Sequence, residues 1–141
     1  MEESDRRGHW GLTAILFGLV YFVAGIVSGG LAAAAASTQG RTAWRLAAWV
    51  ASAAAFAAHI RYEHVRMRSS PVRTAWHTAA AVALGAFGLA AAANIRAQIT
   101  LAHARPLLRL SLLIWPVMSG IPAFVVALAA AAFLARTRRS A

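Results

Sequence analysis

Apolar side chains run through this sequence in four blocks separated by short segments that contain arginine. The first block, residues 10–40, has no charged side chain, and the third fills the twenty-two residues between Arg73 and Arg96. The fourth fills the twenty-six residues 110–135. Because a membrane-crossing helix needs about 20 predominantly apolar residues, each of these blocks is long enough to cross a bilayer.

The second block is shorter, with fifteen residues between Arg45 and Arg61. It reaches across a bilayer only if both arginines extend toward the headgroup layers. A lone strand cannot satisfy its backbone in hydrocarbon, and the alternating pattern of a barrel is absent, so all four blocks should be helices. The pattern predicts one all-α membrane domain over residues 1–141, a four-transmembrane-helix bundle. Its expected helices are about 10–36, 43–62, 74–95 and 108–135.

The composition agrees with a membrane location. Of the 141 residues, 60% are hydrophobic and only 13% are charged, whereas soluble domains carry about 25% charged residues. The chain has no cysteine, which excludes disulfides and thiolate metal sites. All its basic residues are arginine and alanine is abundant. Both features suit a GC-rich bacterial genome, and hence the bacterial cytoplasmic (inner) membrane.

The net charge of +10 comes from fourteen arginines and four acids. These arginines border the apolar blocks instead of clustering as a nucleic-acid surface would require, so the lipid bilayer is the expected partner and nucleic acid is not. With a cytoplasmic N-terminus, nine arginines fall on the cytoplasmic side and five on the other. Positive charge concentrates on the cytoplasmic side of membrane proteins. Both termini are therefore predicted to be cytoplasmic.

Polar residues in the second and third blocks share helical faces. Ser52, His59 and Glu63 recur at helical spacing, and His77 lies in the third block just after Arg73. A short connection should make the two helices antiparallel neighbours. The sequence therefore predicts one polar cluster, at the cytoplasmic end of the bundle, formed by His59, Glu63, Arg73 and His77.

Two histidines on facing helices can ligate a b-type haem, with nearby arginines neutralising its propionates. His59 and His77 are thus candidate haem or metal ligands, and haem b is the candidate cofactor. Zinc could use Glu63 as well, although nothing in the sequence fixes a fourth ligand. The alternative interpretation is that both imidazoles only bond to backbone, lipid headgroups or Glu63.

Small residues mark expected helix contacts. Gly25 and Gly29 form a GxxxG step in the first block, and Gly85 and Gly88 make a smooth patch in the third. Such positions let helices approach closely in lipid. They serve either packing within the chain or a homodimer, and both uses stay open.

The fourth block contains Pro116 and Pro122. Each proline removes a helix hydrogen bond and frees a carbonyl oxygen. Broken helices of this kind line binding sites in transporters, so the two prolines form a candidate helix-break site. A plain kink is the other interpretation, and the one favoured here.

No catalytic residues are evident, because Glu63 is the only acid beyond the N-terminal segment. The sequence therefore predicts a small polytopic membrane protein without catalytic activity of its own. It would serve as a solute or ion pathway, or as a subunit of a larger membrane complex. The alternative is a haem b electron-transfer subunit that uses His59 and His77.

Overall fold

The structure is a computed structural model that describes residues 2–100 and 106–137. These residues form four helices, α1 (Glu2–Ala34), α2 (Thr38–Val65), α3 (Pro71–Thr100) and α4 (Pro106–Thr137). No strand occurs in the two described ranges. The predicted all-α fold with four helices is confirmed. The helices are longer than the apolar blocks, and α1 begins at Glu2 rather than near residue 10.

The starts of three helices follow from local chemistry. Ser37 precedes α2, and its hydroxyl oxygen accepts a hydrogen bond from the Gly40 N–H at 3.0 Å, as an N-cap does. Helices α3 and α4 begin at Pro71 and Pro106. Proline suits the first helical position because the N–H it lacks would have no partner there.

The turn between α2 and α3 has a left-handed residue. Arg68 has a φ of 47°, a backbone conformation that glycine usually adopts after the end of a helix. The Ser69 N–H then donates to the Glu63 carbonyl oxygen at 3.2 Å. This closure holds Ser69 beside the last turn of α2.

Three helical segments are long and apolar enough to cross a membrane: Trp10–Ala34, Pro71–Thr100 and Leu108–Thr137. Helix α2 is not among them. Its 28 residues include charged groups near both ends and inside the last turns, which lowers its mean hydropathy. The structure therefore supports an integral membrane protein through three helices, while a crossing by α2 stays a prediction.

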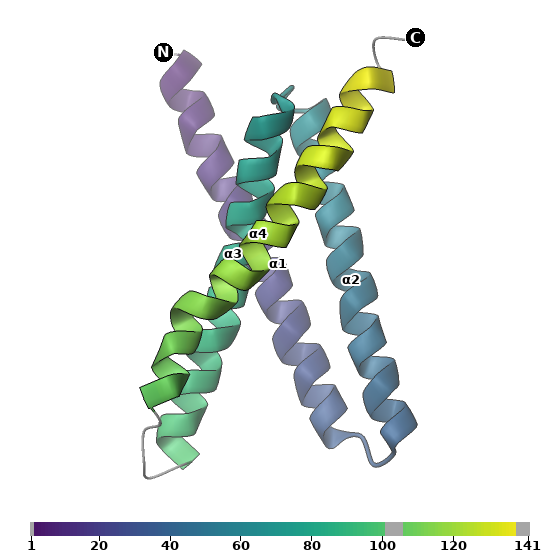
Figure 1. The fold of residues 1–141 in the computed structure, drawn as a ribbon, viewed down its shortest axis with the longest axis vertical. Coiled ribbons are helices and arrows are strands. Elements are labelled where there is room, and N and C mark those ends of the chain that lie inside the picture. Colours follow the sequence, from purple (N-terminus) through teal and green to yellow (C-terminus); the bar gives the residue numbers. More distant parts are fainter. Residues whose placement is uncertain (1, 101–105, 138–141) are drawn as a thin grey trace.

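Helix α3 is the central element, because it has the most extensive contacts with both α4 and α1 and also touches α2. Helices α1 and α4 have no close backbone contact within the described ranges. Figure 1 shows α1 paired with α2 and α3 paired with α4, with the two pairs crossing and then separating toward the α1–α2 connection. Both chain ends lie at the opposite end of the molecule, where α2 also connects to α3 (Figure 1).

The interior is made of small residues, whereas the large apolar side chains face outward. Among the residues whose burial the structure describes, most buried apolar residues are alanines, and only Tyr21 and Ile60 are larger. Half-buried Phe56 packs against both buried clusters, one around Ala81 and one around Ala127. Leucine, isoleucine, valine and tryptophan side chains are exposed along the helices. This distribution suits a bundle in lipid, where small residues permit close packing and no water drives large ones inward.

Helices α1 and α3 approach most closely at glycines. A Cβ on Gly85 would lie 2.6 Å from Tyr21 Cβ and 3.0 Å from the Gly18 carbonyl oxygen. A Cβ on Gly25 would lie 2.7 Å from a methyl carbon of Leu89. Gly88 is similarly close to the Phe22 ring, with a Cβ at 2.8 Å. These three glycines therefore serve packing within the chain.

Gly29 is different from the other three predicted packing glycines. A Cβ at Gly29 would meet no atom within 4 Å. It lies beyond the crossing point, where α1 and α3 have begun to separate. The structure thus places it on an open helix face.

We expect Gly85→Ala to lower the free energy of unfolding in detergent by about 1 to 3 kcal/mol, the usual effect of overpacking. The added methyl group would clash with the rigid Cβ of Tyr21. Gly29→Ala is the matched control, since the same methyl group enters open space and alanine favours helix. Equal stabilities of the two variants in an SDS titration would contradict the close crossing.

Candidate functional site: a buried carboxylate and imidazole cluster

Polar side chains gather inside the bundle near the α2–α3 connection. They come from the last turns of α2 and the first turns of α3, with α1 alongside. The buried polar residues of this region are Thr13, His59, Glu63, His64, Thr74 and Thr78. In a bundle whose interior is otherwise alanine, this concentration of polar groups is the main candidate for a functional site.

Glu63 lies at the centre of this cluster and has 0% of its surface exposed. Its Oε2 accepts a hydrogen bond from the Ser69 hydroxyl at 2.8 Å. The same oxygen lies 3.1 Å from Nδ1 of His77, whose side chain is 14% exposed. The left-handed turn at Arg68 supplies the hydroxyl, and the first turns of α3 supply the imidazole. A buried carboxylate requires such partners.

Two aromatic rings of α1 cover the histidines. Trp10 stacks on His77 with ring centroids 4.9 Å apart and planes 11° apart. Phe17 stacks on His59 at 4.1 Å and 1°. Trp10 and Phe17 are seven residues apart, so two turns of helix place them on one face of α1. One face of each imidazole is therefore covered by an aromatic ring of α1.

The pKa of Glu63 is set by opposing effects. Burial alone would raise it, whereas the contacts with His77 and Ser69 and the charge of the neighbouring imidazoles lower it. The contacts prevail, and the pKa lies below its ordinary value of 4.5. The carboxylate is therefore ionised at neutral pH, although it is buried.

Several polar atoms of the cluster have no hydrogen-bond partner among the described residues. They are both ring nitrogens of His59 and of His64, Oε1 of Glu63 and the hydroxyl oxygens of Thr74 and Thr78. Nδ1 of His77 has no hydrogen-bond partner in this sense either, and its 3.1 Å contact with Glu63 is an ion-pair contact. Buried polar groups in proteins nearly always have partners, and exceptions often have a functional reason. These atoms are consequently available to a proton, an ion or a small polar ligand.

The structure brings some, but not all, of the predicted cluster residues His59, Glu63, Arg73 and His77 together. His77 touches Glu63, and His59 lies one helical turn before Glu63 within the same buried region. The side chain of Arg73 is exposed, and the backbone N–H of Arg73 donates to the Ser70 hydroxyl oxygen at 3.4 Å. No arginine forms an ion pair with Glu63 within residues 2–100 and 106–137. The partner of the acid is an imidazole.

Metal binding by this cluster gains no geometric support. Within the part of the chain that the structure describes, no group of three or more His, Cys, Asp or Glu side chains is arranged to hold a metal ion. This applies to the set of His59, Glu63 and His77 that the sequence suggested for zinc.

Pro116 and Pro122 lie inside α4, which continues through both of them to Thr137. Neither residue belongs to the buried polar cluster. The polar link between α3 and α4 lies elsewhere, where Asn94 Nδ2 donates to the Ser111 hydroxyl at 3.0 Å.

Sequence analysis did not identify several members of the cluster. Thr74 and Thr78 flank His77 on α3, so helical spacing could have indicated them. His64 follows Glu63 directly and is also buried. The sequence pattern did not indicate the contact between Ser69 and Glu63, because this contact depends on the left-handed turn at Arg68.

We expect Glu63→Gln to lower the free energy of unfolding in detergent by about 1 to 3 kcal/mol at pH 7, the range for a buried charged hydrogen bond. Glu3→Gln should have little effect, since it changes an acid of the N-terminal segment. Thermal unfolding in mild detergent measures both. If the two variants are equally stable, the buried pair contributes nothing to the fold.

The same pair predicts a pH dependence. Because the pKa of Glu63 is lower in the folded protein, its stabilising contribution is complete above about pH 4.5 and is lost as the pH falls through the folded value. The stability difference between wild type and Glu63→Gln should therefore shrink on acidification. A difference that is as large at pH 3 as at pH 7 would contradict the lowered pKa.

Comparison with known proteins gives no further guide to the cluster: no family model, no curated protein and no solved structure matches this chain.

Proposed function

We propose that the protein is a small integral membrane protein without catalytic activity of its own, which provides an ion or solute pathway whose proton-binding site is the pair Glu63 and His77. It would act alone or as a subunit of a membrane assembly. The observation that carries the proposal is the contact between a fully buried carboxylate and an imidazole at 3.1 Å. Ionisable groups inside membrane proteins are costly and typically mark ion paths and proton relays.

The chemistry of the pair supports proton binding. An imidazole nitrogen can carry a proton, and a carboxylate 3.1 Å away can share that proton through a charge-assisted contact. His59 lies on α2 one helical turn before Glu63. Both of its ring nitrogens are buried and have no hydrogen-bond partner among the described residues. Protonatable groups thus continue from the connection toward the bundle interior.

We further propose that α2 completes a fourth crossing and that both termini are cytoplasmic, in a bacterial inner membrane. The nine-to-five distribution of arginines supports this orientation. The arrangement in Figure 1, where the start of α1, the end of α4 and the α2–α3 connection share one end of the molecule, supports placing both termini on the same side of the membrane. A second copy or another membrane protein remains a proposed partner, in addition to the lipid bilayer.

Single cysteines at Ser4, Gln39, Met67 and Ser140 test the topology, because the chain has no cysteine of its own. Only position 39 should react with a membrane-impermeant thiol reagent added to intact cells. If positions 39 and 67 react alike, α2 does not cross. If 4, 67 and 140 react while 39 does not, the orientation is inverted.

Proton transport can be measured in liposomes that contain the purified protein and a pH-sensitive dye. An imposed potential should drive proton entry in the wild type, and Glu63→Gln should slow it at least about tenfold, because the buried site loses its charge. Glu3→Gln is the matched control and should conduct like the wild type. Equal flux through Glu63→Gln, or no flux above protein-free vesicles, would contradict the proposal.

The alternative function, haem b-based electron transfer, has one favourable observation. Both nitrogens of His59 are buried and without a described partner, so either could ligate iron. However, His59 has no exposed surface. A porphyrin could reach either ring nitrogen only by displacing the side chains packed around it, so the residues present do not fit haem as they stand. Gently extracted protein should lack a Soret band, and a stoichiometric band that His59→Ala removes would favour haem.

A further inference from the structure

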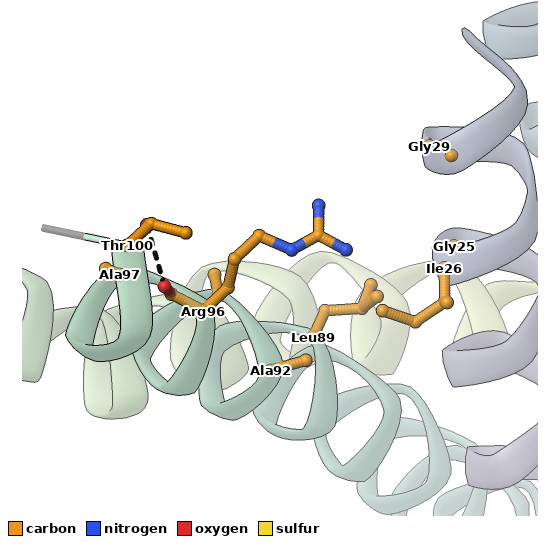
Figure 2. A pocket seen from close by; sticks show the side chains of 10 residues that line it. Gly25, Ile26, Gly29, Leu89, Ala92, Arg96, Ala97 and Thr100 are labelled. Atoms are coloured by element: carbon orange, nitrogen blue, oxygen red, sulfur yellow. Dashed lines mark hydrogen bonds between the residues drawn. The ribbon is translucent and has the colours of Figure 1, made fainter. Parts of the chain in front are cut away.

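A groove lies between α1 and α3 at the end of the molecule opposite the polar cluster. It encloses about 450 Å³ between the C-terminal parts of the two helices. Gly25 and Leu89 close its apex, and Gly29 and Gly30 form the α1 wall. Figure 2 shows these walls and the side chain of Arg96 between them.

The groove results from the crossing of α1 and α3. At Gly25 the helices are so close that a Cβ would overlap Leu89. Just over one helical turn later, a Cβ on either Gly29 or Gly30 would meet no atom within 4 Å. The helices therefore separate and leave an apolar wedge. In a bilayer, such a wedge must be filled by lipid or by another protein.

Arg96 places a positive charge in this groove. Its guanidinium extends from α3 toward α1, across the groove (Figure 2). It has no ion-pair partner among the described residues. Glu63, the one acid whose side chain the structure describes, lies in the last turn of α2 beside the α2–α3 connection, whereas Arg96 lies in the last turns of α3. An unpaired cation beside an apolar groove is complementary to an anionic amphiphile.

The depth of Arg96 is that of a lipid headgroup. Residues 74–95 of α3 contain no charged side chain, and this stretch spans about 33 Å at 1.5 Å per residue. The hydrocarbon core is about 30 Å thick. Arg96 therefore lies where lipid phosphates lie, while Ala92 and Leu89 lie at the depth of acyl chains.

We propose that this groove binds one anionic phospholipid, with an acyl chain along Gly29 and Gly30 and the phosphate on the Arg96 guanidinium. The charge favours a lipid over a second copy of this chain. The described part of that end carries arginines and no acid, so two such ends would repel each other. The apolar walls favour a lipid over free phosphate. This site is independent of the proposed ion pathway.

Native mass spectrometry of the full chain in mild detergent tests the proposal, with phosphatidylglycerol and phosphatidylcholine as probes. The wild type should retain one phosphatidylglycerol more tightly than phosphatidylcholine. Arg96→Gln should weaken phosphatidylglycerol binding about fivefold, the factor expected for one arginine at an anionic surface. Arg45→Gln, which removes the same charge at the same end outside the groove, should leave binding unchanged.

The apolar part of the groove is tested by a substitution whose side chain fills it. Gly29→Leu should reduce phosphatidylglycerol binding without unfolding the chain, because its side chain enters open space. Gly11→Leu is the control, since Gly11 also has nothing within 4 Å. Inorganic phosphate should not displace the lipid.

Three results would overturn the proposal. The first is equal loss of binding in Arg96→Gln and Arg45→Gln, which would indicate a diffuse charge effect. The second is displacement of the lipid by inorganic phosphate, which would indicate an anion site without a role for the groove. The third is a dimer that Gly29→Leu dissociates while lipid binding is unchanged, which would assign the groove to a second copy.

Discussion

The close crossing of α1 and α3 determines where both candidate sites lie. Gly18 and Gly85 bring the two backbones together, since any larger residue at position 85 would meet Tyr21. Before the crossing, Trp10 and Phe17 of α1 stack on the two histidines. After the crossing, the helices separate and leave the groove beside Arg96. One contact between small residues thus creates a covered polar cluster at one end and an open wedge at the other.

The polar cluster shows how a bundle with few acids can hold one inside. Glu63 has no arginine partner within the described residues, although four arginines lie within ten positions of it in the sequence. The pairing with His77 and Ser69 keeps the carboxylate ionised without bringing a permanent positive charge into the interior. An arginine partner would remain charged at every accessible pH. An imidazole partner does not carry such a fixed charge.

The sequence was sufficient to predict four helices because segments that contain arginine separate the four apolar blocks. It also placed His59, Glu63 and His77 on facing helices, since their spacing and the short connection restrict the geometry. It could not identify Ser69 or exclude Arg73, because side-chain partners depend on the left-handed turn at Arg68. The contrast between Gly25, which is covered, and Gly29, which is open, depends on the crossing angle, and spacing alone does not carry that information.

The low mean hydropathy of α2 is compatible with its proposed crossing once burial is considered. Three of the polar residues that lower it, His59, Glu63 and His64, are buried inside the bundle, whereas Arg41, Arg45 and Arg61 are exposed nearer its ends. Its exposed large residues in the middle of the helix are apolar, as with Trp49 at 77% and Val50 at 69% exposure. Hydropathy averaged along a sequence counts both faces, whereas lipid contacts only the outer one. A helix that keeps its polar face inward can therefore border lipid although its average composition falls short of a typical span.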